Sequence, residues 1–153
     1  MKSYSSNLFG AQALILILMM LSTLKIQAFD IGRFDQSNAF ALGKDLVAMP
    51  FGMQLLEANN ADADELVIGI HGGNSEGYEW IYPLWQLNQE SNQVFFYRWN
   101  DRRCANANNA KLVNHIVTLL DNYSKVKKIK ILSHSYGGTC LLYTSPSPRD
   151  LST

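Results

Sequence analysis

Three short runs of apolar residues constrain the fold of this 153-residue chain more than any other feature. The runs are Leu66–Ile70, Val94–Tyr97 and Ile129–Leu132, and only Lys130 interrupts them. A continuous apolar run of this length is typical of a strand that is covered on both faces, as in a parallel sheet. We therefore expect these runs to be strands of one buried, mostly parallel sheet.

The segments between these runs have the spacing of helices. One apolar stripe separates the second run from the third, and it consists of Val113, Ile116, Val117, Leu120 and Tyr123. Residues 77–87 separate the first run from the second, and we expect a shorter helix there that Pro83 limits or begins. The alternation of strand and helix predicts an α/β domain with right-handed crossovers.

The segment before the first run is less regular. Its two apolar stretches, Leu46–Met49 and Met53–Leu55, are separated by Pro50 and Gly52, and we expect them to be two leading strands. Thirteen basic residues balance thirteen acidic ones, so no net charge favours nucleic acid as a partner. Only Cys104 and Cys140 are present, which is too few for a disulfide framework and matches no metal site. We expect neither a metal nor a cofactor.

The N-terminus resembles a targeting signal. Lys2 precedes the apolar run Ala13–Leu24, which ends near the small residue Ala28. This layout is typical of a secretory signal peptide. The run is shorter than the roughly 20 apolar residues that span a bilayer. We expect residues 1–28 to be a signal peptide and the protein to be exported, with an uncleaved membrane anchor as the alternative.

The third apolar run leads directly into a candidate catalytic turn. Residues Ser133-His134-Ser135-Tyr136-Gly137-Gly138 fit the pattern G-x-S-x-G, with Ser133 in place of the first glycine. This strand-to-helix turn, the nucleophile elbow, needs small residues two positions before and two positions after the nucleophile. The pattern predicts Ser135 as the nucleophile and the backbone N–H of Tyr136 as a donor to an oxyanion.

The first apolar run ends in a glycine-rich loop, His71-Gly72-Gly73-Asn74. Glycine lets a backbone N–H approach a developing negative charge closely. We expect Gly73 to be the second oxyanion donor and His71 to shape the loop. A plain tight turn is the alternative interpretation of this segment.

Together, Leu66–Gly138 resembles the lipase and esterase-like branches of the α/β-hydrolase superfamily. The resemblance implies a mostly parallel sheet, a Ser-His-Asp/Glu triad and acyl transfer through a covalent acyl-enzyme. In this superfamily the acid and the histidine follow the serine in the chain. No histidine follows His134, and Asp150 is the one acid after Ser135. We expect His115, on the helix, to have a packing or surface role.

Residues 140–153 do not continue the pattern of the domain. Pro146 and Pro148 come too soon for a normal helix after Ser135. The eleven residues Cys140–Asp150 resemble a translated sequencing adapter, because one frame of a transposase mosaic end and its adjoining adapter encodes them in order. We expect residues 29–139 to be the N-terminal half of an α/β-hydrolase domain, truncated after the elbow. A genuine proline-rich C-terminus is the alternative.

Two further groups of residues allow more than one interpretation. The loop Asp101–Cys104 is expected to be a solvated polar loop, although it could contact an anionic group. Four aromatic residues follow the glycine loop and are expected to pack on the sheet, with a role in an acyl pocket as the alternative; they are Tyr78, Trp80, Tyr82 and Trp85.

The sequence thus predicts an exported serine hydrolase that cleaves carboxylic esters of a lipid-like kind through an acyl-enzyme on Ser135. We expect the 153 residues alone to be inactive, because they lack the triad acid and histidine. A non-catalytic binding protein that keeps the elbow without a triad is the alternative function. Its partner would be a small molecule or lipid ester, and the oligomeric state is left open.

Overall fold

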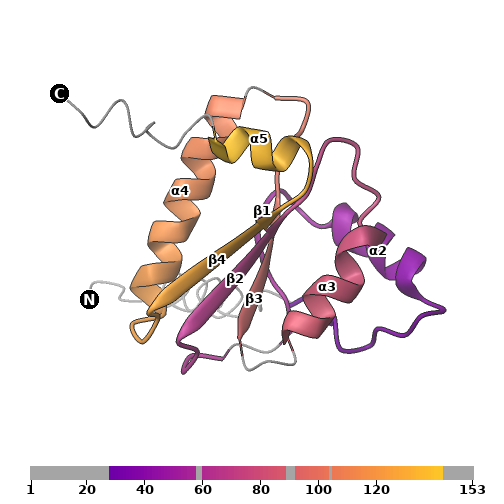
Figure 1. Cartoon of the computed structure of the whole chain (residues 1–153), viewed down its shortest axis with the longest axis horizontal. Helices are drawn as coiled ribbons and strands as arrows, with labels where there is room; N and C mark the ends of the chain where they lie inside the picture. The colour runs from indigo at the N-terminus through magenta and orange to yellow at the C-terminus, as the bar shows by residue number, and fades with distance from the viewer. Residues whose placement is uncertain (1–27, 58–59, 89–91, 104, 143–153) are drawn as a thin grey trace, which may run out of the picture.

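The computed structural model describes residues 28–57, 60–88, 92–103 and 105–142, which form an open sheet with helices on both faces (Figure 1). The elements in chain order are α2 (Ala39–Ala48), β1 (Gly52–Leu55), β2 (Glu65–Ile70), α3 (Tyr78–Asn88), β3 (Gln93–Arg98), α4 (Ala105–Asn122), β4 (Lys128–Ser133) and α5 (Tyr136–Leu142). The three apolar runs are therefore strands β2, β3 and β4, as the sequence predicts. The expectation that β4 is buried on both faces is wrong, because this strand lies at the edge of the sheet and is largely exposed.

The sheet has the strand order β1-β3-β2-β4. Strand β2 is parallel to both of its neighbours, with Ile68 opposite Phe95 of β3 on one side and Ile131 of β4 on the other. Strand β1 runs antiparallel to β3. The prediction of an α/β domain with a mostly parallel sheet is confirmed at this level.

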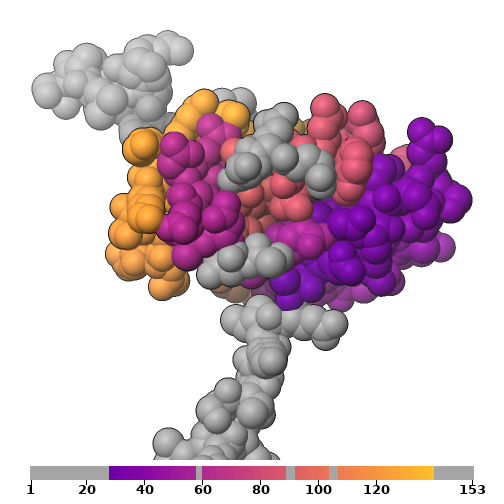
Figure 2. All heavy atoms as spheres, turned by 90° about the horizontal axis from the view of Figure 1, so that it is seen from below, coloured from indigo at the N-terminus to yellow at the C-terminus, as the bar shows by residue number. Residues whose placement is uncertain are grey.

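Each face of the sheet carries its own apolar core, because successive residues of a strand point to opposite faces. Val67, Val94 and Phe96 face α2 and α3. Ile68 and Phe95, their neighbours in sequence, face α4. Figure 2 shows the same layers from below, with the indigo N-terminal segment and the orange C-terminal segment on opposite sides. Burial on both faces explains why β2 and β3 lack polar alternation.

The predicted strand at Leu46–Met49 is wrong, because Leu46 lies in helix α2. Leu42 and Leu46, one helical turn apart, are both buried against α3 and the sheet. Two apolar residues one turn apart are too few to reveal the helical spacing of apolar residues in the sequence. The second predicted strand, Met53–Leu55, is confirmed as part of β1.

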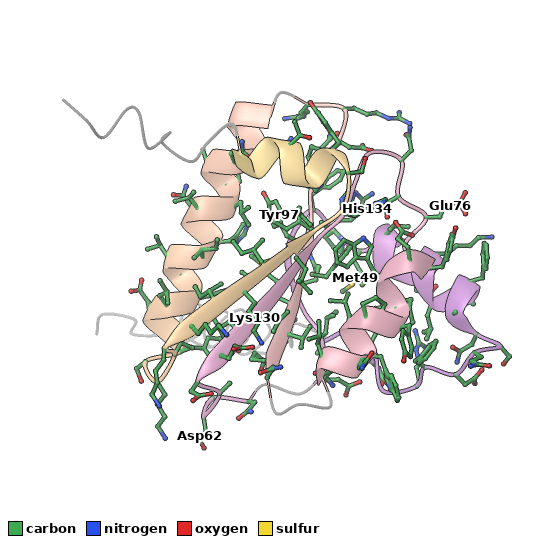
Figure 3. The ribbon with its side chains drawn as sticks, in the orientation of Figure 1. Met49, Asp62, Glu76, Tyr97, Lys130 and His134 are labelled. Carbon is green, nitrogen blue, oxygen red and sulfur yellow. The ribbon has the colours of Figure 1, made fainter. Side chains whose placement is uncertain are left out.

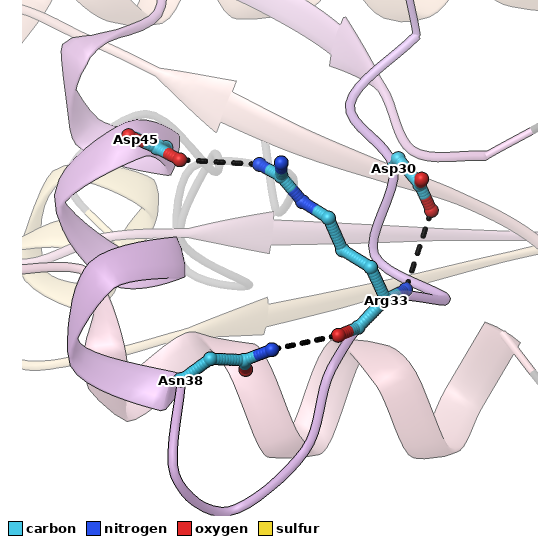
Figure 4. Close-up of polar contacts among 4 residues, drawn as sticks. All are labelled: Asp30, Arg33, Asn38 and Asp45. Atoms are coloured by element: carbon cyan, nitrogen blue, oxygen red, sulfur yellow. Dashed lines mark hydrogen bonds and ion pairs between the residues drawn. The ribbon is translucent and has the colours of Figure 1, made fainter.

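Polar contacts hold the segment before α2 in place (Figure 4). The guanidinium of Arg33 forms an ion pair with Asp45 of α2 at 3.1 Å. Its backbone N–H donates to Asp30 Oδ1 at 3.3 Å, and its carbonyl oxygen accepts from Asn38 Nδ2 at 2.7 Å. Both members of the ion pair are at least half exposed, so its contribution to stability is small.

The predicted buried stripe of α4 is only partly correct. Tyr123 is buried and Ile116 is partly buried, but the sheet covers Leu112 and Leu119 in place of the other predicted members. The three remaining predicted residues are exposed: Val113 by 55%, Val117 by 53% and Leu120 by 45%. Apolar residues cover a wide arc of this helix, and only the part of the arc over β2 and β3 meets the sheet.

Helix α3 contains Pro83 in its interior, so the expectation that this proline limits or begins the helix is wrong. A proline inside a helix removes one hydrogen bond and costs about 3 kcal/mol. Trp80, Ile81 and Leu84 are buried against the sheet from the same helix. Burying a large apolar side chain contributes roughly 1.5–3 kcal/mol. The packing of this face therefore offsets the cost of Pro83.

The predicted signal peptide falls on residues 1–27, which lie outside the described residues, and on Ala28. Residues 143–153 of the predicted tail, with Pro146, Pro148 and Asp150, also lie outside them. Among the described helices, none combines the length and the apolar character needed to cross a membrane.

Candidate active site

Ser135 lies at the tight connection between β4, which ends at Ser133, and α5, which begins at Tyr136. Its φ angle is 51°, in the left-handed region that side chains with a Cβ rarely adopt. A residue in this region costs of order 1–3 kcal/mol unless it is glycine, and such residues cluster at functional sites. The strand, the strained turn and the helix that the elbow pattern requires are all present around Ser135.

The glycines after Ser135 allow the turn to pack against the end of β2. A Cβ added to Gly137 would lie 2.5 Å from the His71 carbonyl oxygen and 3.0 Å from that of Ile70. The N–H of His134 donates to the same Ile70 carbonyl at 3.1 Å. A Cβ at Gly138 would lie 3.0 Å from Ser133 Oγ. Contact with β2 thus fixes the position of the elbow, and Gly137 is the residue that permits it.

The glycine loop after β2 reaches the elbow directly. A Cβ added to Gly72 would lie 3.1 Å from both the His134 carbonyl oxygen and Ser135 Cβ, and 3.2 Å from His134 Nδ1. A Cβ at Gly73 would meet nothing within 4 Å. The two motifs, about sixty residues apart in sequence, are therefore in contact in the fold.

The two predicted oxyanion donors are available for a ligand. Among the described residues, neither the N–H of Gly73 nor that of Tyr136 donates a hydrogen bond to another protein group. The ring of Tyr136 lies 5.5 Å from that of Trp99. Backbone N–H groups without a protein partner must bind water or a ligand oxygen.

His71 is buried beneath the glycine loop, with 1% of its surface exposed. Its Nδ1 lies 2.7 Å from the Gly72 carbonyl oxygen, and its Nε2 lies 3.2 Å from both the Trp99 N–H nitrogen and Arg98 Nη1. Arg98 can only donate, so we assign the proton of the neutral ring to Nδ1. Burial lowers the pKa of His71, and the nearby charge of Arg98 lowers it further. His71 therefore acts as a neutral link between the loops after β2 and β3.

The loop after β3 holds the glycine loop from its other side. Asn74, at a φ of 52°, donates its N–H to Asp101 Oδ2 at 2.7 Å. Trp99 Nε1 donates to the His71 carbonyl oxygen at 2.8 Å. No sequence motif marks Trp99, and Asp101 is expected from the sequence only as part of a solvated polar loop. Both residues follow the carboxyl end of a buried strand, where open α/β sheets place their ligand sites, and this position could have marked them as site residues.

A surface hollow of about 410 Å³ opens beside the elbow. Gly73, Asn74 and Ser75 line it from the glycine loop, Glu76, Tyr78 and Glu79 from the start of α3, and His134 from the elbow. Figure 3 shows His134 and Glu76 at the same end of the sheet.

The aromatic residues after the glycine loop divide into two groups. Trp80 is buried, close to Gly69 and in edge contact with Phe96. Tyr78 is 44% exposed and lines the hollow. Tyr82 is exposed and lies away from the hollow, with its ring 6.1 Å from that of Trp85. Of the four, only Tyr78 is placed where it could contact a ligand at this hollow.

The described residues contain no acid–histidine pair. None of His71, His115 and His134 contacts a carboxylate there. The ring of His115 lies on α4, 5.9 Å from that of Tyr97. Within the same residues, no group of three His, Cys, Asp or Glu side chains could hold a metal ion. The described residues thus bring together a candidate nucleophile and its predicted oxyanion donors, without an oriented base.

The site also coincides with a change of direction in the fold. Helix α3, which follows β2, packs on α2, β2 and β3, whereas α5, which follows the adjacent strand β4, packs beside α4 (Figure 1). Open α/β sheets bind ligands at the carboxyl ends of strands where the chain departs in opposite directions. Comparison with protein-family models, with curated proteins and with solved structures gave no significant match to this chain.

Proposed function

We propose that this chain carries the nucleophile half of an exported serine hydrolase of the α/β-hydrolase kind, which cleaves carboxylic esters of a lipid-like class. One observation carries the proposal: Ser135 has a strained left-handed backbone at a strand-to-helix turn that touches the glycine loop of the neighbouring strand. Strained backbone of this kind is typical of functional sites, and a turn that presents the serine hydroxyl to a substrate would account for it.

In the proposed reaction, Ser135 Oγ attacks the ester carbonyl carbon, and its proton passes to a base. The negative charge that develops on the carbonyl oxygen accepts hydrogen bonds from the Gly73 and Tyr136 N–H groups. The alcohol then leaves with a proton from the base, and the acyl group remains on Ser135. Water, deprotonated by the same base, attacks the acyl carbon and releases the carboxylic acid.

The base and its orienting acid are not among the described residues, and no histidine follows His134 in the sequence. The proposal therefore places a histidine and an acid in natural sequence beyond the elbow, in place of residues 140–153. The lack of a histidine after His134 also favours the second candidate function, a binding protein that holds an ester or lipid at the hollow beside His134 without cleaving it.

The test uses the protein extended through its natural reading frame and a fluorophosphonate probe, which reacts only with an activated serine. We expect labelling of the wild type, loss of labelling in Ser135→Ala, and retention of labelling in the control Ser133→Ala. Undiminished labelling in Ser135→Ala would reject Ser135 as the nucleophile. An extended sequence that lacks a histidine after Ser135, together with no labelling, would favour the binding protein.

A further inference from the structure

A second hollow, of about 550 Å³, lies at the carboxyl end of β3 between β1 and α4. We name it the β3–α4 hollow and define it by six of its polar lining residues: Arg98, Asn100, Arg103, Lys111, Asn114 and His115. Among the described residues, no aspartate or glutamate lines it. Three positive charges and amide side chains therefore line this hollow, and the nearest acid that acts on them, Asp101 beside Arg98, lines the neighbouring hollow.

Two of these cations have no carboxylate partner. Within the described ranges, neither Arg103 nor Lys111 forms an ion pair, and both side chains are exposed. The lysines at the opposite end of the sheet are each paired with an acid: Lys125, Lys127, Lys128 and Lys130. The chain thus neutralises its basic cluster at one end and leaves the cations of the β3–α4 hollow available.

The backbone that carries Arg103 is held in place. The Asn100 carbonyl oxygen accepts hydrogen bonds from Asn108 Nδ2 at 2.9 Å and from the Arg103 N–H at 3.1 Å. Asn100 Oδ1 accepts from the Arg102 N–H at 3.1 Å. These bonds fix the loop to α4, the helix that carries Lys111. A fixed loop reduces the entropy lost when its side chains bind a ligand.

Arg98 has a different role from the other two cations. Its Nε donates to the Val47 carbonyl oxygen at 2.7 Å, and its Nη1 donates to that of Trp99 at 2.9 Å. Its guanidinium lies 4.8 Å from the centre of the Phe51 ring. Arg98 is thus anchored as a fixed positive wall, while Arg103 and Lys111 can adjust to a ligand.

The β3–α4 hollow is connected to the candidate active site. A third hollow, of about 380 Å³, shares Phe51, Arg98 and Asn100 with it. The same third hollow shares Asn74 and Ser75 with the hollow beside His134. The three hollows therefore form one line along the carboxyl edge of the sheet, from the elbow to Lys111.

We propose that the β3–α4 hollow binds the phosphate group of a small phosphate ester. A phosphate monoester has three terminal oxygens and a charge between about −1 and −2, so it matches Arg103, Lys111 and the Asn114 amide better than a carboxylate, which has one charge. That this phosphate belongs to the substrate cleaved at Ser135 rests on the proposed function. The substrate would then be an ester with a phosphate at one end, laid along the three hollows.

The test measures binding of glycerol 3-phosphate by calorimetry, with uncharged glycerol as the ligand control. We expect saturable binding that weakens at least roughly tenfold in Arg103→Gln/Lys111→Gln, since each charged hydrogen bond lost weakens binding by about that factor. Lys111→Glu, a second variant, should bind weaker still. Lys44→Gln removes an exposed charge on α2 and should leave binding unchanged.

Four outcomes would overturn the proposal. They are no saturable binding of glycerol 3-phosphate, binding of glycerol as tight as that of glycerol 3-phosphate, wild-type affinity in both natively folded variants Arg103→Gln/Lys111→Gln and Lys111→Glu, or loss of binding in Lys44→Gln. Circular dichroism of each variant establishes that fold. Inorganic phosphate that binds as tightly as the ester would assign the hollow to free phosphate and overturn the ester part. Glycerol 3-phosphate contains no carboxylic ester, so binding of this ligand without fluorophosphonate labelling would count against the hydrolase proposal alone, and labelling without binding would count against this one alone.

Discussion

Gly137 packs so closely on His71 that a Cβ at Gly137 would lie 2.5 Å from the His71 carbonyl oxygen. Real Cβ atoms essentially never approach that closely, and the atom in the way is backbone. The elbow and the end of β2 are therefore held at a separation that only glycine permits. This contact couples the candidate nucleophile to the loop that offers the Gly73 donor.

Replacing Gly137 by alanine should destabilise the protein by roughly 1–3 kcal/mol, because the added methyl group forces two backbone segments apart. Gly73→Ala is the matched control in the neighbouring loop, where a Cβ meets nothing within 4 Å. We expect that control to change the free energy of unfolding by less than about 0.5 kcal/mol. Urea unfolding of both variants gives the comparison. Equal stability of the two variants would contradict the close contact.

The backbone of Ser135 predicts an unusual order of stability among its variants. Glycine usually destabilises a protein relative to alanine, by roughly 0.5–1 kcal/mol. At a φ of 51°, however, alanine keeps the strain of the left-handed region and glycine does not. We expect Ser135→Gly to be more stable than Ser135→Ala by about 1 kcal/mol. Ser133, in the extended strand β4, should show the reverse order, and the same order at both positions would refute the strain.

Much of the sheet could be predicted from sequence because of how its strands are buried. Strands β2 and β3 are covered on both faces, so their apolar character is continuous and visible. Helix α2 could not be predicted, since Leu42 and Leu46 are the only large apolar side chains that it buries. The buried side of α4 was also undetermined, because a wide apolar arc does not reveal which part faces the sheet.

The candidate site divides in the same way. The elbow and the glycine loop are local patterns, so the sequence alone could mark Ser135 and Gly73 as candidates. The links that join the loops, from Trp99 to His71 and from Asn74 to Asp101, depend on β2 lying between β3 and β4. No local pattern specifies that strand order, so these positioning contacts became visible only in the fold.

The stability of the protein should depend on the protonation of His71. Burial holds the pKa of this side chain below its ordinary value, so the folded protein keeps it neutral. The unfolded chain takes up a proton as the pH falls through about 6.5. The contribution of neutral His71 is therefore complete above that pH and is lost as the pH falls toward its lowered pKa in the folded state.

We expect the free energy of unfolding to fall by up to about 1.4 kcal/mol per pH unit as the pH decreases below about 6.5, until the pH reaches the lowered pKa of His71 in the folded state. His71→Gln cannot titrate, so its slope in this range should be smaller, although its stability should be lower throughout. Urea unfolding at several pH values measures both slopes. Parallel slopes for the wild type and His71→Gln would exclude His71 as the source.

The exposed side of α4 should cause self-association. Val113, Val117 and Leu120 are about half exposed along one line of the helix, and Ile131 of the edge strand β4 is 40% exposed. An apolar edge strand is a template for pairing with another chain, and an exposed apolar patch strengthens that tendency. We expect the wild type to show an apparent mass that rises with concentration in analytical ultracentrifugation.

Placing a charge within this patch should suppress the association. Val117→Lys and Ile131→Lys replace exposed side chains, so each variant should fold. Each should raise the dissociation constant for self-association at least roughly tenfold, because association would bury an unpaired charge. Thr118→Lys adds the same charge on a different side of the same helix and should associate like the wild type. Association that responds equally to Val117→Lys and Thr118→Lys would show that net charge, and not this apolar surface, controls it.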